Sequence, residues 1–102
     1  MSLLHTVNKS PFTHSTLSSC LDVIAPGDAL LLIEDGIYGS LDSSPLIDRL
    51  LGLQEDGVDL FALVEDVKAR GLLGKTCEEF TNIRMTEFVK LSADCDSVKS
   101  WF

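Results

Sequence analysis

The sequence has no apolar run long enough to cross a membrane. A membrane span needs roughly 18 consecutive apolar residues, and the runs present here are much shorter. Residues 1–12 also lack the basic and then apolar order that is typical of a signal peptide. We therefore expect a cytoplasmic protein that does not bind membranes.

Cysteine is sparse and shows no pairing pattern. Cys20, Cys77 and Cys95 are odd in number and widely spaced, and no CxxC pair occurs. A disulfide framework or a zinc knuckle requires paired or closely spaced cysteines. We expect three free thiols in a reducing compartment and no metal site.

Basic residues are also few. The chain has 8 Lys and Arg against 16 Asp and Glu, which gives a formal net charge of −8. Nucleic-acid affinity depends largely on Lys and Arg that neutralise phosphates. Direct nucleic-acid binding is therefore not expected, and a protein partner fits this composition better.

The motifs of common enzymes are missing. The sequence contains neither GxGxxG nor a Walker A loop, and neither GxSxG nor HExxH. This excludes the usual nucleotide-binding, serine-hydrolase and zinc-peptidase signatures. No cofactor is expected.

The clearest structural signal is the apolar run at residues 29–33, which ends in Glu34, Asp35 and Gly36. A strand buried on both faces of a parallel sheet reads as such a run. The two carboxylates would then lie at the carboxyl end of the central strand, where open α/β sheets place their functional crevice.

The rest of the chain alternates between strand and helix patterns. Strands are predicted at residues 3–7, 58–64 and 82–85, with a last strand or docked tail at 98–102. Helices are predicted at residues 15–24, 45–51, 65–71 and from 86 onward, and residues 36–41 are ambiguous. This order predicts one domain over residues 1–102, an α/β/α sandwich with a mostly parallel sheet of about five strands.

Among the thiols, Cys20 is the candidate for chemistry. On a helical wheel it lies beside the apolar stripe of its helix, so a partner could reach a thiol that is partly shielded. The alternative, which we favour, is a small core residue, the usual role of a free cysteine. Cys95 is expected in the core. Cys77 is expected to be exposed, with Glu78 and Glu79 opposing thiolate formation.

Four other sites are considered. His5 and His14 could assist a thiol, although a structural role with satisfied hydrogen bonds is favoured for His5. The Glu34 and Asp35 carboxylates could act as acid and base, but we favour a turn cap for Asp35 and a solvated or subunit-facing Glu34. The aromatic pair at residues 101 and 102 could anchor on a neighbouring chain.

Several sequence blocks resemble the DsrH/TusB family. They are LHTVNKSPF at residues 4–12, Cys20-Leu21, LLLIEDGIY at 30–38, DVKARG at 66–71, EFV at 87–89, and Trp101. The resemblance covers nearly the whole chain and implies a DsrE-like fold. It also implies a small subunit that assembles with DsrE/TusD-like and DsrF/TusC-like paralogues into a heterohexamer.

In this family the complex passes persulfide sulfur toward a DsrC/TusE-like carrier. The sulfur is used for 2-thiouridine in tRNA or in dissimilatory sulfur oxidation. The DsrE/TusD-like subunit supplies the principal acceptor cysteine. The resemblance matches Cys20 to a cysteine of DsrH-type members, which favours the Dsr branch, and gives Cys77 no role.

Three hypotheses follow. In the first, Cys20 carries persulfide sulfur by exchange at a sulfur–sulfur bond. In the second, which we favour slightly, the chain is a non-catalytic or accessory subunit of a sulfurtransferase complex, with a role in structure and recognition. The third is an independent homo-oligomeric protein-binding module without sulfur chemistry.

Overall fold

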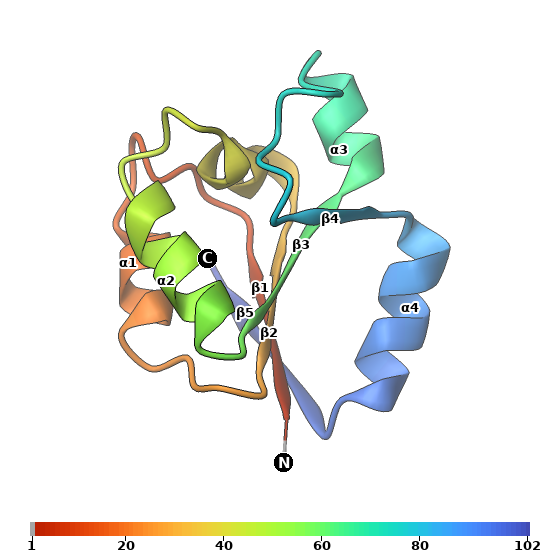
Figure 1. Cartoon of the computed structure of the whole chain (residues 1–102). Helices are drawn as coiled ribbons and strands as arrows, with labels where there is room; N and C mark the ends of the chain where they lie inside the picture. Colours follow the sequence, from red (N-terminus) through yellow and green to blue (C-terminus); the bar gives the residue numbers. More distant parts are fainter. Residues whose placement is uncertain (1) are drawn as a thin grey trace.

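A computed structural model describes residues 2–102, and strands and helices alternate along them (Figure 1). The strands are β1 (Leu3–Val7), β2 (Ala29–Leu32), β3 (Asp59–Leu63), β4 (Thr81–Ile83) and β5 (Ser97–Trp101). The helices are α1 (Thr16–Leu21), the 3-10 helix η1 (Glu34–Ser40), α2 (Ile47–Glu55), α3 (Val64–Ala69) and α4 (Met85–Asp94). The predicted alternation is confirmed, and the last segment forms a strand.

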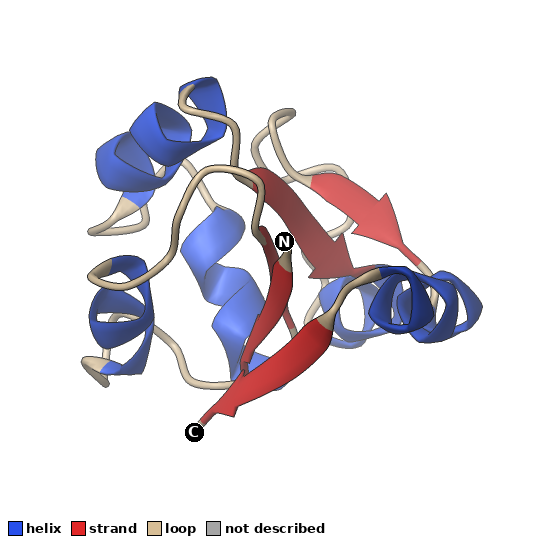
Figure 2. Ribbon diagram, turned by 90° about the horizontal axis from the view of Figure 1, so that it is seen from below, coloured by secondary structure: helices blue, strands red, loops and turns tan. Residues whose placement is uncertain are grey.

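The strands form one five-stranded sheet in the order β4-β3-β2-β1-β5, and every neighbouring pair is parallel. Helices α1 and α2 lie on one side of this sheet and α4 lies on the other (Figures 1 and 2). The expected α/β/α sandwich with a parallel sheet is therefore confirmed. Because β5 follows β4 but pairs with β1, the chain crosses the sheet from one edge to the other through α4.

The core is divided by the sheet into two apolar clusters. Leu30 and Leu32 belong to the larger cluster, with residues of α1, η1 and α2, and Leu31 belongs to the smaller cluster under α4. All three side chains are fully buried. Alternate residues of a strand point to opposite faces, so a central strand with both faces covered must be apolar throughout.

Helix boundaries differ from the predicted ones in all four helices. Helix α3 runs over Val64–Ala69 rather than residues 65–71. Helix α1 ends at Leu21 rather than at residue 24. Helix α2 begins at Ile47 and continues through Gly52 to Glu55; the chain turns instead at Gly57, whose φ of +106° suits glycine. Helix α4 begins at Met85, where residue 86 was the predicted start.

The start of α4 shows why the helix boundary was misjudged. Thr86 has the hydroxyl group that commonly caps a helix, but the helix begins one residue earlier. The backbone N–H of Arg84 donates to Glu87 Oε1 over 3.0 Å. A glutamate one turn into the helix therefore binds back to the preceding residue, as in one half of a capping box.

Within residues 2–102, none of the helices has the length and apolar character required to cross a membrane.

Candidate functional site

Cys20 lies on the inner face of α1 and is fully buried. Its helix packs on the sheet, and Cys20 joins the larger core cluster together with Val7 and Leu17. The thiol has no exposed surface in this structure, so Cys20 is the small core residue that the sequence favours and not a partly shielded thiol. Residues of α1 and of the strands beneath it share this cluster with Cys20.

The surroundings of Cys20 favour the protonated thiol. Burial away from water raises the pKa of Cys20 to about 12; the positive charge of Lys99 lowers that pKa in part, and the negative charge of Asp28 raises it. Since the thiolate is the nucleophilic form, the closed fold keeps Cys20 unreactive near neutral pH.

His5 lies on β1 and is 1% exposed, and both of its ring nitrogens are hydrogen-bonded. Trp101 Nε1–H donates to His5 Nδ1 over 3.1 Å. An indole N–H can only donate, so Nδ1 must be the acceptor and the proton of the neutral ring must lie on Nε2. His5 Nε2–H then donates to Asp28 Oδ2 over 3.1 Å. The predicted structural role of His5 is confirmed.

Asp28 is the acceptor at the end of this chain of hydrogen bonds, and the sequence analysis missed it. Its carboxylate also accepts from the backbone N–H groups of Leu3, at 3.0 Å, and Ala25, at 3.1 Å. Desolvation acts to raise the pKa of Asp28, but these two backbone donors and His5 outweigh it, so the pKa lies below its ordinary value. The Pro26-Gly27-Asp28 turn was the signal available in the sequence.

Two carboxylates, Asp35 after β2 and Asp66 in α3, lie close to Arg70. Asp35 Oδ1 accepts from Arg70 Nε over 2.9 Å, and the same guanidinium group lies 3.8 Å from Asp66. Asp66 also accepts from the backbone N–H of Glu34, whose φ is +50°. Asp35 therefore forms an ion pair, and its predicted role as a turn cap is wrong, because Arg70 reaches back from beyond α3. Glu34 is exposed, as expected.

Cys77 is 8% exposed, so its predicted exposure is wrong. Its backbone N–H donates to the carbonyl of Ser40 over 2.8 Å, which draws the loop onto the core. Its Sγ–H donates to Asp42 Oδ1 over 2.9 Å. Burial, and then the contact and charge of Asp42, raise the pKa of Cys77 to about 12. Cys95 packs against the smaller cluster as expected but remains partly exposed.

The remaining sequence candidates lie apart from this arrangement. His14 is exposed in the loop before α1, where its Nδ1 lies 2.8 Å from Thr13 Oγ1. Trp101 turns inward to His5 and does not extend from the chain as an anchor for a neighbour, whereas Phe102 is 85% exposed. Among residues 2–102 no three His, Cys, Asp or Glu side chains are grouped so that they could hold a metal ion.

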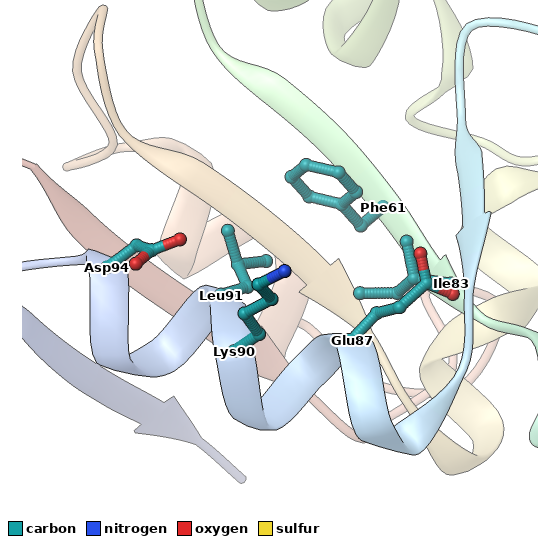
Figure 3. A pocket seen from close by; sticks show the side chains of 6 residues that line it. All are labelled: Phe61, Ile83, Glu87, Lys90, Leu91 and Asp94. Carbon is teal, nitrogen blue, oxygen red and sulfur yellow. The ribbon is translucent and has the colours of Figure 1, made fainter.

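A shallow open groove of about 270 Å³ lies between α4 and the β3–β4 edge of the sheet (Figure 3). Its apolar surface and its charged side chains come from Phe61, Ile83, Glu87, Lys90, Leu91 and Asp94. Both signs of charge are present, so the charges of the groove do not select one class of partner.

The fold and the buried Cys20–His5–Asp28 region define a small α/β protein with a parallel sheet. Residues 9–98 match the family described as DsrH like protein. The chain is 35% identical over 99 residues to Protein TusB from Erwinia tasmaniensis, covering 97% of this chain and 100% of that protein. It is 33% identical to Protein TusB from an Enterobacter species with the same coverage. The chain therefore belongs to the DsrH family of sulfur-relay subunits.

The fold has a solved counterpart in the ychN protein from E. coli, for which a crystal structure exists. The two chains superpose with a TM-score of 0.85, and 98% of each chain is covered. Their sequences are 14% identical, so this similarity bears on the fold alone. It supports the parallel α/β fold.

Proposed function

We propose that this chain is the small subunit of a heterohexameric sulfur-relay complex of the DsrEFH/TusBCD type. Its own role in the complex is structure and recognition rather than sulfur chemistry. Its partners would be DsrE/TusD-like and DsrF/TusC-like paralogues, and the complex would pass sulfur to a DsrC/TusE-like carrier. Family membership supports the relay. The single observation that carries the accessory role is the full burial of Cys20.

The accessory role also fits the charge of the chain. A net charge of −8 disfavours direct contact with tRNA, so RNA would be met elsewhere in the relay. We further propose that residues 1–102 act as one domain in the cytoplasm. Such a domain would contribute protein surface to the complex while the principal sulfur chemistry occurs on a paralogue.

The second candidate function is persulfide transfer at Cys20 itself. The Cys20 thiolate would attack the outer sulfur of a donor persulfide, a new sulfur–sulfur bond would form, and the donor thiolate would leave. No oxidant is needed, because one sulfur–sulfur bond replaces another. The nearby positive charge of Lys99, which lowers the pKa of Cys20 in part, favours this candidate.

A Cys20→Ser variant separates the two candidates. The chain would be co-expressed with both paralogues, the complex purified, and transfer of sulfur from a persulfide donor to the carrier followed by mass spectrometry, at about 32 Da per sulfur atom. The accessory role predicts unchanged transfer in Cys20→Ser. Loss of transfer from an intact complex would contradict it and support persulfide transfer at Cys20. Cys95→Ser is the matched control.

Co-purification tests the assembly itself. A tagged chain should recover the DsrE/TusD-like and DsrF/TusC-like paralogues in equal amounts. Recovery of copies of this chain alone would favour the independent homo-oligomeric binding module. The acceptor pathway is tested by deleting the gene: loss of 2-thiouridine from tRNA indicates the thiolation branch, and loss of sulfur oxidation indicates the Dsr branch.

A further inference from the structure

Strand β5 is held by one neighbour only. It lies at the edge of the sheet and pairs with β1, with Leu4 opposite Val98, His5 opposite Lys99, and Val7 opposite Trp101. Of its five residues only Trp101 is even partly buried. An edge strand with few buried side chains detaches at a lower free energy than the strands inside a sheet.

The side chain that fastens β5 is Trp101. The alternation of the strand directs Lys99 and Trp101 to the face of the sheet that carries α1. The Trp101 indole stacks near His5, with ring centroids 6.3 Å apart, and donates its N–H to His5. Lys99 Nζ lies over the Trp101 ring, 4.4 Å from its centroid. These contacts join the end of the chain to its buried first strand.

Cys20 lies beneath these contacts of Trp101 with His5 and Lys99. Helix α1 contacts both β1 and β5, and Trp101 packs against the cluster that contains Cys20. The charge of Lys99 is close enough to act on the Cys20 thiol. The C-terminus lies on the α1 side of the sheet in both views (Figures 1 and 2). Strand β5 therefore covers one side of the space around Cys20, and the Trp101–His5 hydrogen bond holds the end of β5 in place.

We propose that β5 is a detachable strap over Cys20, that the Trp101–His5 hydrogen bond is its latch, and that release of β5 opens Cys20 while the rest of the fold stays intact. The inference rests on the second candidate function, persulfide transfer at Cys20, only in giving the opened thiol a use. The strap itself is a property of the isolated chain.

The rate of Cys20 labelling tests the strap. In a full-length chain carrying Cys77→Ser and Cys95→Ser, a neutral aromatic disulfide reports on Cys20 alone. Trp101→Phe keeps the ring and removes the N–H donor, so we expect labelling to accelerate about five- to tenfold, the factor for a neutral hydrogen bond.

Ile83→Val is the control for global unfolding. Ile83 is buried in the smaller cluster on the other face of the sheet, so its truncation lowers the free energy of unfolding without touching β5. The strap predicts that Ile83→Val leaves the labelling rate unchanged and that labelling depends only weakly on urea below the unfolding transition. Equal acceleration by Ile83→Val and Trp101→Phe, with the urea dependence of global unfolding, would overturn the proposal.

The two proposals fail separately. Failure of the chain to co-purify with the paralogues would contradict the proposed function and leave the labelling result unaffected. Labelling of Cys20 only through global unfolding would contradict the strap and leave the subunit role unaffected. Within the complex, the same labelling series shows whether assembly releases the strap: partners that open it should make Cys20 react faster than it does in the isolated chain.

Discussion

Trp101 and His5 are 96 residues apart in the sequence, and the indole N–H of the first donates to Nδ1 of the second over 3.1 Å. This hydrogen bond fixes the tautomer of a buried imidazole. Because Nδ1 accepts, Nε2 must carry the proton of the neutral ring, and Nε2–H donates a hydrogen bond to Asp28. One hydrogen-bonded chain thus connects the last strand, the first strand and the turn before β2.

Replacing His5 with leucine should destabilise the fold by about 2–4 kcal/mol. The substitution leaves the Trp101 N–H without its acceptor and the buried Asp28 carboxylate without one donor, and such orphaned groups cost their full desolvation. The free energy of unfolding, measured in urea, checks this. Thr6→Val is the control: Thr6 is also buried and donates to Ser100 of β5 over 3.3 Å, but its loss should cost less than about 1 kcal/mol.

The contribution of Asp28 should depend on pH in a defined direction. Its pKa in the fold is lowered, so its stabilisation is fully present above the unfolded value of about 3.9 and is lost as pH falls toward the lowered value. Asp28→Asn should therefore be clearly less stable than the native chain at pH 7, and the difference should shrink as the pH falls below about 4. A constant difference across this range would show that the charge of Asp28 is not what stabilises the fold.

The parts of the fold that the sequence predicts are those set by interactions between residues close together in the chain. The run at residues 29–33 predicts a doubly covered strand because each of its residues meets an apolar layer, whichever face it points to. The predicted helix at residues 65–71 ends at Gly71, whose φ of +69° is one that glycine adopts readily. Both signals depend on neighbouring residues, and local rules are enough to interpret them.

The site was less predictable because its contacts are long-range. Trp101 of β5 packs against the cluster that contains Cys20, and the loop of Cys77 closes on Ser40. Neither contact leaves a periodic pattern near the cysteine. The Asp28–His5 contact spans 23 residues and joins two residue types that are individually common, so only the parallel pairing of β1 with β2 brings them together.

The three thiols should react at different rates with an aromatic disulfide in the native chain. Cys95 is partly exposed, whereas Cys20 and Cys77 are buried and their pKa values are raised to about 12. We expect one fast thiol near pH 8 and two slow ones, since access and thiolate fraction both limit the slow pair. Peptide mapping after a brief reaction should find the label on Cys95, and fast labelling of all three would contradict the structure.

The turn that leaves β2 depends on the absence of a side chain at residue 36. A Cβ at Gly36 would lie 2.1 Å from the carbonyl oxygen of Val7, the same oxygen that accepts from the backbone N–H of Ile33 over 3.0 Å. Gly36→Ala should therefore separate the ends of β1 and β2 and destabilise the chain by more than about 2 kcal/mol.

Gly52 provides the matched control for this substitution. It lies inside α2, and a Cβ there would meet nothing within 4 Å. Gly52→Ala should raise the free energy of unfolding by about 0.5–1 kcal/mol, because alanine loses less conformational entropy in a helix. The same glycine-to-alanine change should therefore shift the urea midpoint in opposite directions at residues 36 and 52. That result would establish that the close approach of residue 36 to Val7, and not a general effect of replacing glycine, limits the side chain at residue 36. If Gly36→Ala were as stable as the native chain, Gly36 of η1 would have to lie farther from the carbonyl oxygen of Val7, at the end of β1, than it does in this structure.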